Sequence, residues 1–283
     1  MNTRQLVRRR YLLASAALAA AWSPAQRAHA QLKSGENPEA SVIWQKLRKS
    51  LFENRPIRSA AEEVLVLDAP GRAEDAAIVP IAMRTRLAQD GPRRLDKLYL
   101  VIDNNPSPLA AVFTFTKESG RADIETRVRI DEYTHVRAIA ELADGSLHMA
   151  TRWVKASGGC SAPPGKDQQA ALASLGRMRF KVDEAVGRPG QPVLAQLMIS
   201  HPNNSGLAMD QGTRQYTPAH FVRKVNVSYG DKPLLSADVD FSISENPNFR
   251  FWFVPQGAGE LKAEVVDSHD LRFETRVAYG PKP

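Results

Sequence analysis

Through most of the chain after residue 55, apolar and polar residues alternate, which is the period of a β-strand that buries one face. The stretch 124–130 is the clearest case, because its even-numbered residues are apolar or threonine and its odd-numbered residues are charged. Asp144-Gly145 separates two further alternating runs and predicts a hairpin, since both residues tolerate positive φ. An earlier stretch, 41–54, has helical spacing. We expect one antiparallel β-sandwich over residues 41–155.

The alternation stops over residues 156–178, where four glycines and Pro163-Pro164 are incompatible with a continuing strand. We interpret this stretch as a flexible arm or linker. Strand-like runs resume at residue 179 and continue through 179–283, about the length of an immunoglobulin-type sandwich. The pattern therefore predicts an all-β protein with two immunoglobulin-like antiparallel β-sandwich domains joined by a Gly/Pro-rich linker.

The net charge of +7 would suit a nucleic-acid partner, but its distribution does not. Residues 1–30 carry five arginines and no acidic residue, and the rest of the chain has 33 basic against 31 acidic residues. The basic character belongs mostly to the first 30 residues. We therefore exclude nucleic acid as a partner.

Residues 1–30 have the three parts of a cleaved secretory signal peptide: a basic start, an apolar middle, and small residues at positions 28 and 30. The apolar run of about 12 residues is shorter than the ~20 of a membrane-spanning helix. Arg8-Arg9-Arg10 before apolar residues resembles a twin-arginine signal; an ordinary secretory signal and an uncleaved anchor are the alternatives. We expect a periplasmic protein with no membrane anchor after cleavage.

The sequence has no motif for common catalytic chemistry. It lacks a phosphate-binding Gly-x-x-x-x-Gly-Lys-Ser/Thr loop, a dinucleotide-binding Gly-x-Gly-x-x-Gly turn and a Gly-x-Ser-x-Gly nucleophile elbow. Its six histidines are scattered, and Ser268-His269-Asp270 fits a polar turn better than a relay, because neighbours on a strand point to opposite faces. We predict no catalytic residue, no metal and no cofactor, and hence a protein that is not an enzyme.

Cys160 is the only cysteine, which excludes an internal disulfide. It follows Gly158 and Gly159 and has no bulky apolar residue within five positions after it, so we expect an exposed thiol on a mobile arm rather than a core cysteine. Two alternatives stay open: an incidental cysteine in a glycine linker, and an intermolecular disulfide. The nearby basic residues that would favour the thiolate are Arg152, Lys155 and Lys166.

The first half resembles the sulfur-carrier family SoxY, whose last strand leads into a Gly-Gly-Cys-Gly-Gly arm. The residues that carry this resemblance are 137–141, Asp144-Gly145, Gly158-Gly159-Cys160 and the Asn-Pro-x-Pro-Leu-Ala-Ala-like segment 104–111. The second half resembles the partner family SoxZ through His201-Pro202, Gly206-Leu207, 218–221 and Asn246-Pro247. Two departures are that Ser161-Ala162 replaces the second glycine pair and that 123 residues follow Cys160. The whole is similar to fused SoxYZ-like carriers, a class associated with quinoprotein dehydrogenase systems.

The resemblance implies a periplasmic, non-enzymatic carrier that holds a thiosulfate-derived or other sulfur-containing group covalently on Cys160, with Gly158 and Gly159 giving the arm its flexibility. Its partners would be periplasmic oxidoreductases or sulfur-processing enzymes. The alternative is an assembly module that docks to a periplasmic quinoprotein dehydrogenase, with Cys160 incidental. A thiol redox enzyme is disfavoured because the chain has no resolving cysteine. His201 and His220 match the SoxZ pattern without an assigned chemistry, and we expect them to be buried or to stabilise turns.

Overall fold

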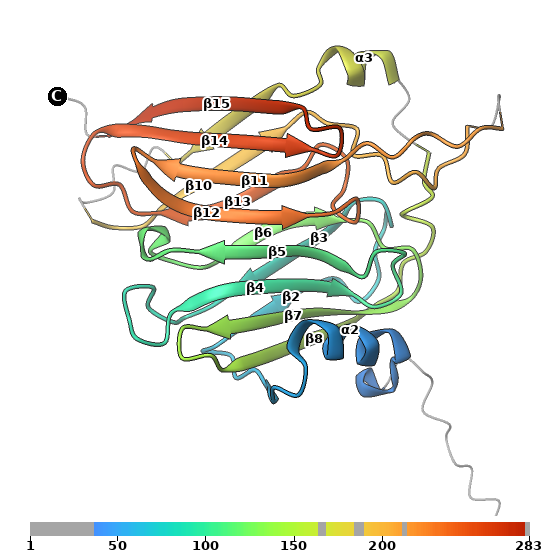
Figure 1. Ribbon diagram of the computed structural model, residues 1–283, viewed down its shortest axis with the longest axis horizontal. Helices are drawn as coiled ribbons and strands as arrows, with labels where there is room; N and C mark the ends of the chain where they lie inside the picture. The colour runs from blue at the N-terminus through green and yellow to red at the C-terminus, as the bar shows by residue number, and fades with distance from the viewer. Residues whose placement is uncertain (1–36, 164–167, 184–189, 211–213, 281–283) are drawn as a thin grey trace, which may run out of the picture. The chain divides into compact units, whose positions relative to one another are not determined.

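The computed structural model describes residues 37–163, 168–183, 190–210 and 214–280. Nearly all regular structure in these ranges is β-strand, arranged in two sheets (Figure 1). The prediction of an all-β fold is therefore confirmed. The predicted signal peptide, residues 1–30, lies outside the described residues.

The first half contains the predicted helix and hairpin. Helix α2 begins after Ser41, whose hydroxyl accepts a hydrogen bond from the backbone N–H of Trp44 at 3.1 Å. Strands β7 and β8 form the hairpin at Asp144-Gly145, where Gly145 has φ +79°. In chain order the elements are η1 (Pro38–Ala40), α2 (Val42–Phe52), β1 (Ile57–Ser59), β2 (Val66–Asp68), β3 (Val79–Arg84), β4 (Leu95–Ile102), β5 (Leu109–Phe115), η2 (Lys117–Ser119), β6 (Ile124–Val128), β7 (Thr134–Leu142) and β8 (Leu147–Val154).

The second half begins with a short helix and continues in strands. Its elements are α3 (Gln168–Ala173), β9 (Met178–Val182), β10 (Val193–Ile199), β11 (Val222–Tyr229), β12 (Lys232–Val239), β13 (Asn248–Phe253), β14 (Gly259–Asp267) and β15 (Arg272–Tyr279).

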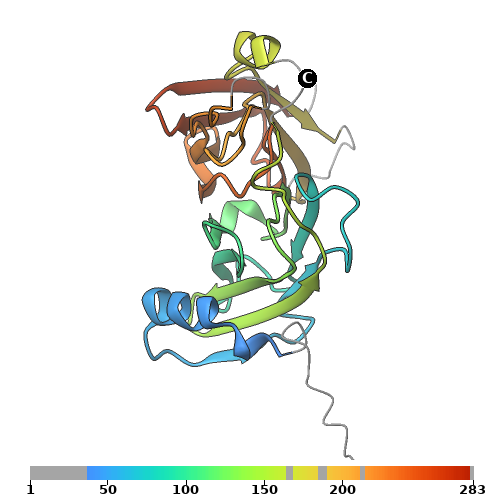
Figure 2. The ribbon, with the colours of Figure 1, turned by 90° about the vertical axis from the view of Figure 1, so that its right-hand side faces the viewer.

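The two halves share both sheets. The nine-stranded sheet has the order β1-β8-β7-β4-β5-β12-β11-β14-β15, and the six-stranded sheet has the order β2-β3-β6-β13-β10-β9. At the junction, β5 pairs antiparallel with β12 and β6 pairs antiparallel with β13. Figures 1 and 2 show the nine-stranded sheet running through both halves, with the other sheet layered against it. The two sandwiches are thus joined edge to edge as well as through the linker.

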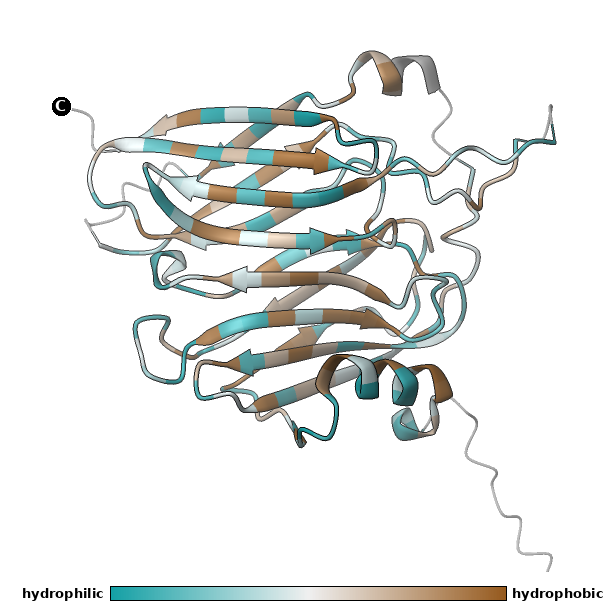
Figure 3. Cartoon of the chain, viewed as in Figure 1, coloured by the Kyte–Doolittle hydropathy of each residue, from teal (hydrophilic) through white to brown (hydrophobic). Residues whose placement is uncertain are grey.

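One apolar core lies between the sheets and includes side chains from both halves. Phe113 of β5 and Phe249 of β13 meet edge to face in it, with ring centroids 6.1 Å apart. Figure 3 shows the underlying pattern, in which hydrophobic and hydrophilic bands alternate along the strands. Because the core crosses the junction, neither half has a complete interior of its own.

Helix α2 packs on the outer face of the nine-stranded sheet near β7 and β8 (Figure 1). Beneath it, Arg137 is fully buried and pairs with Asp103 through two hydrogen bonds of 2.8 and 2.7 Å. The Arg137 guanidinium also lies 4.5 Å from the ring centroid of Trp44, a cation–π contact that holds the helix on the sheet. No helix in the described ranges is both long enough and apolar enough to cross a bilayer.

Candidate functional site

Cys160 lies on the segment that follows β8, and the structure buries it, with 1% of its surface exposed. Two backbone hydrogen bonds hold this segment against the first half. They join Gly158 N to Asp131 O at 2.7 Å and Gly159 N to Ile130 O at 2.9 Å. The expectation of an exposed thiol on a mobile arm is therefore wrong for this conformation.

Gly159 supplies the physical reason. A Cβ at this position would lie 2.0 Å from the carbonyl oxygen of Ala76 and 2.7 Å from that of Ile130, so only glycine lets the backbone approach this closely. Gly158 has φ +81°, a conformation that glycine adopts without strain, and open space surrounds it. The glycines that suggested mobility instead allow the arm to pack flat against the body.

Loops of the second half also contact the Cys160 segment and its neighbour Arg129. In the second half, the Ser205 hydroxyl donates a hydrogen bond to the Cys160 carbonyl oxygen at 2.5 Å. Arg129, which is 7% exposed, ties these loops together because its Nη1 donates to the carbonyl oxygens of Asn203 at 2.7 Å and Ile243 at 2.9 Å. Cys160 belongs to neither cluster of buried apolar side chains. Cys160 is therefore a buried residue on a segment that is hydrogen-bonded to both halves.

The surroundings of Cys160 disfavour its thiolate. Burial raises the pKa of the thiol to about 12, with a further increase from the carboxylates of Asp131 and Asp240 and an opposing effect from Arg129. The cation that acts on the thiol is therefore Arg129. Of the basic residues suggested by the sequence, Arg152 and Lys155 are exposed and Lys166 lies outside the described residues. We call the buried position of Cys160 in this structure its seat. At neutral pH the seated thiol is protonated and is a poor nucleophile.

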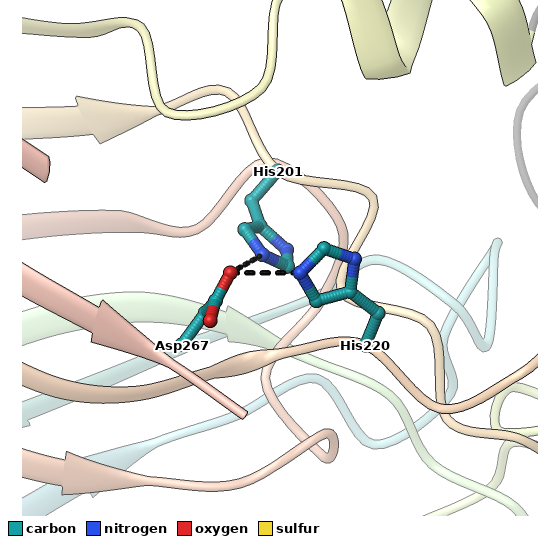
Figure 4. A group of neighbouring side chains, drawn as sticks. All are labelled: His201, His220 and Asp267. Carbon is teal, nitrogen blue, oxygen red and sulfur yellow. Dashed lines mark hydrogen bonds and ion pairs between the residues drawn. The ribbon is translucent and has the colours of Figure 1, made fainter. Parts of the chain in front are cut away.

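A second polar cluster joins two histidines and an aspartate (Figure 4). His201 follows β10, His220 precedes β11, and Asp267 is the last residue of β14. Asp267 Oδ2 lies 2.7 Å from Nε2 of His220 and 3.5 Å from Nε2 of His201. Its Oδ1 accepts the backbone N–H groups of His269 and Leu271, both at 2.9 Å. The carboxylate is therefore a buried acceptor of three hydrogen bonds, and Nε2 of His201 lies close to it without a hydrogen bond.

The hydrogen bonds define the protonation of the cluster. His201 Nδ1 accepts the backbone N–H of Asn203 at 3.0 Å, so the ring proton of neutral His201 is on Nε2, facing Asp267. Burial, with a contribution from His220, lowers the pKa of His201 to about 4, and this ring is neutral at pH 7. Burial alone would raise the pKa of Asp267, but the hydrogen bond from His220 and two backbone N–H groups lower it below its usual value. Asp267 is therefore a carboxylate at pH 7.

Two histidines and a carboxylate are a donor set that zinc and similar ions use. A neutral imidazole has one nitrogen lone pair, and in His201 the hydrogen bond from Asn203 occupies it. Nε2 of His201 therefore cannot bind a metal in this arrangement. The geometry corresponds better to a His–Asp dyad, in which a carboxylate orients an imidazole base.

The sequence did not place these side chains together. His201, His220 and Asp267 are far apart along the chain, and only the pairing of strands in the second half brings them into contact. Ser268-His269-Asp270 is a turn, as expected, but the residue just before it is the centre of the cluster. The available signal was that both histidines flank predicted strand ends. The expectation that they are buried is confirmed, with 1% of His201 and 9% of His220 exposed.

Comparisons with known proteins divide the chain in the segment between its two halves. Residues 48–160 match a family model described as sulfur oxidation protein SoxY, and residues 180–278 match one described as sulphur oxidation protein SoxZ. No curated protein sequence matches the chain.

Among solved structures, the sulfur carrier protein SoxY from Chlorobium limicola f thiosulfatophilum is 22% identical over 44% of this chain and 98% of its own, with a TM-score of 0.35. A variant of a superoxide reductase (neelaredoxin) from Ignicoccus hospitalis is 13% identical over 45% of this chain and 99% of its own, with a TM-score of 0.27.

Proposed function

Since the chain belongs to the SoxY and SoxZ families, with the two domains fused in that order, we propose that it is a periplasmic carrier that holds a thiosulfate-derived group covalently on Cys160. The observation that carries the proposal is that the SoxY match ends on Cys160, the one cysteine of the chain. The protein presents this group to separate sulfur-processing enzymes and turns nothing over itself. The secretory pattern of residues 1–30 supports export.

The loading step forms a disulfide bond between Cys160 Sγ and the outer sulfur of thiosulfate. The thiol loses its proton, and two electrons pass to a partner oxidoreductase, leaving a cysteine S-thiosulfonate with one negative charge. The attacking species is the thiolate, so the reaction needs a pKa well below the value that burial imposes on Cys160.

The arm must therefore leave its seat before loading. Among the described residues, the hydrogen bonds that hold it at Gly158, Gly159 and Cys160 are the two backbone bonds from the glycines and the one from Ser205. Each contributes about 1 kcal/mol. Such an arm protects the thiol from oxidation when seated and releases it at modest cost when a partner binds.

Intact-mass measurement of protein isolated from the periplasm tests the carrier role. We expect a fraction of molecules to carry a mass addition of thiosulfonate or a shorter sulfur chain, which a thiol reductant removes. The Cys160→Ser variant must lack the addition. Unmodified protein from cells that are oxidising thiosulfate would contradict covalent carriage.

The burial of Cys160 favours one alternative, a module that docks to a periplasmic quinoprotein dehydrogenase with the cysteine incidental. Complementation of a deletion strain separates the two roles. A carrier requires the thiol, so Cys160→Ser should fail to restore growth on the sulfur substrate. Equal complementation by wild type and Cys160→Ser would establish the assembly role instead.

A further inference from the structure

The His201–His220–Asp267 cluster holds one basic nitrogen in a fixed place. His220 donates its Nε2 proton to the buried Asp267 carboxylate at 2.7 Å, so the lone pair of its neutral ring is on Nδ1. His269 stacks on the ring, with centroids 3.9 Å apart, and the ring of His201 lies at 78° to it, with centroids 4.6 Å apart. The stacked ring and the hydrogen bond at Nε2 together orient the imidazole.

The loop that contacts the arm also contacts His220. Ser205 binds the Cys160 carbonyl oxygen, and Asn204, its neighbour, accepts the backbone N–H of His220 at 3.0 Å. The residue that is hydrogen-bonded to the arm, Ser205, and the residue that is hydrogen-bonded to the His220 backbone, Asn204, are therefore adjacent in the sequence. The backbone of the arm and the backbone of His220 are thus both hydrogen-bonded to the same loop.

We propose that His220 accepts the proton of the Cys160 thiol once the arm is displaced, which rests on the proposed carrier function. The S–H bond of Cys160 breaks, an N–H bond forms at Nδ1 of His220, and the electron pair stays on sulfur as the thiolate. No oxidant or reductant takes part in this transfer. Asp267, already hydrogen-bonded to Nε2, stabilises the imidazolium that results. Asp267 is a positioning residue, and His220 acts on the reacting atom.

Other charged groups near the ring do not replace it. His201 has its lone pair occupied by Asn203, and the Asp267 carboxylate already accepts three N–H groups. Arg223, on β11, donates Nε to the Asp267 carbonyl oxygen at 3.0 Å and pairs with Asp270. His269 stacks on His220 from the exposed side. Within the part of the chain that the structure describes, His220 is the ring of this group that donates to a carboxylate and makes no hydrogen bond at its second nitrogen.

The test compares the pH profile of Cys160 alkylation by iodoacetamide, a small neutral probe, in variants whose arm is already displaced. Gly159→Ala provides that background, because its Cβ would collide with the Ala76 carbonyl. With His220 present, we expect reactivity to persist below pH 8 as a thiolate–imidazolium pair. Adding His220→Gln, which keeps a donor for Asp267, should leave a single inflection near the ordinary thiol value and lower the rate at pH 7 about tenfold.

Two further variants distinguish a proton acceptor from a structural residue. Asp267→Asn should lower the alkylation rate below pH 8 more than above it, because it destabilises the imidazolium that accompanies the thiolate, whereas a purely structural change would alter the rate equally at every pH. His148→Gln, a matched substitution at a histidine that contacts Ser146 in the first half, should change nothing. Identical pH profiles with and without His220 would overturn the inference. The carrier function has its own readout, the mass adduct on Cys160, so either proposal can fail alone.

Discussion

The sharpest consequence of the structure is that adding one methyl group at position 159 should expose the thiol. In Gly159→Ala the new Cβ would lie 2.0 Å from the Ala76 carbonyl oxygen, 2.6 Å from the Ala76 carbonyl carbon and 2.7 Å from the Ile130 carbonyl oxygen. All three neighbours are backbone atoms, so no side-chain rotation relieves the collision. The arm has to move instead.

The size of the effect follows from two quantities. Three hydrogen bonds of about 1 kcal/mol each hold the segment, so the seated form is favoured by ~3 kcal/mol, or on the order of 100-fold. Burial raises the thiol pKa from 9.0 to about 12, so full release increases the thiolate fraction at neutral pH by about 1000-fold at most. We expect the alkylation rate of Cys160 to rise between ~100-fold and that limit.

The assay is iodoacetamide labelling of the purified full-length protein at pH 7.5, followed by intact mass. Gly71→Ala is the matched control, because no atom lies within 4 Å of a Cβ at that position. Gly158→Ala should give a smaller increase, since open space surrounds it and only its positive φ, +81°, is strained. If Gly159→Ala folds normally and labels at the wild-type rate, glycine packing does not control access to the thiol.

Three further outcomes are expected. Ser205→Ala removes one hydrogen bond from the arm, so Cys160 labelling should rise roughly fivefold to tenfold; an unchanged rate would show that Ser205 does not hold the seated form. Burial lowers the pKa of His201 to about 4, so below pH 6.5 the unfolded state binds a proton that the folded state does not. The free energy of unfolding should therefore fall by about 3 kcal/mol between pH 6.5 and pH 4, and this pH dependence should be weaker in His201→Gln. Equal pH dependence in the two proteins, measured by urea unfolding, would argue against the burial effect. Phe249→Ala opens a cavity where the halves meet, so it should cost about 3–5 kcal/mol in denaturant unfolding and keep a single transition; two separated transitions would mean that the halves fold independently.

The alternation of apolar residues was enough to predict the all-β class and the place where the first half ends. Periodicity reports which face of a strand is buried, and it does so strand by strand. It does not report which edges meet. The pairing of β5 with β12 and of β6 with β13 depends on the complementary edges of strands that are far apart in the sequence. For this reason the continuous sheets and shared core were not predictable from the pattern.

The sequence singles out Cys160 as a candidate attachment site, but it does not predict that the residue is buried. Cys160 stands out because it is the single cysteine in a glycine-rich segment, but composition cannot distinguish a glycine that permits motion from one that permits close approach. That distinction depends on the carbonyl of Ala76, which tertiary packing brings to within contact of Gly159. The dyad of His220 and Asp267 was missed for the same reason. Its members are ordinary residues at strand ends until the sheet places them together.

The shared sheets also limit how cargo can be presented. The arm runs from β8, in the nine-stranded sheet, to β9, at the edge of the six-stranded sheet, so its two ends are fixed on the same body. From Val154 to Cys160 the chain has six steps and reaches ~20 Å when fully extended. The longer path from Cys160 to Met178 does not limit this reach. A loop enters a partner as two backbone segments side by side, whereas a free end enters as one. An enzyme that processes a group on Cys160 therefore needs an open cleft whose reacting centre lies within ~20 Å of the carrier surface, and a narrow tunnel would exclude this arm.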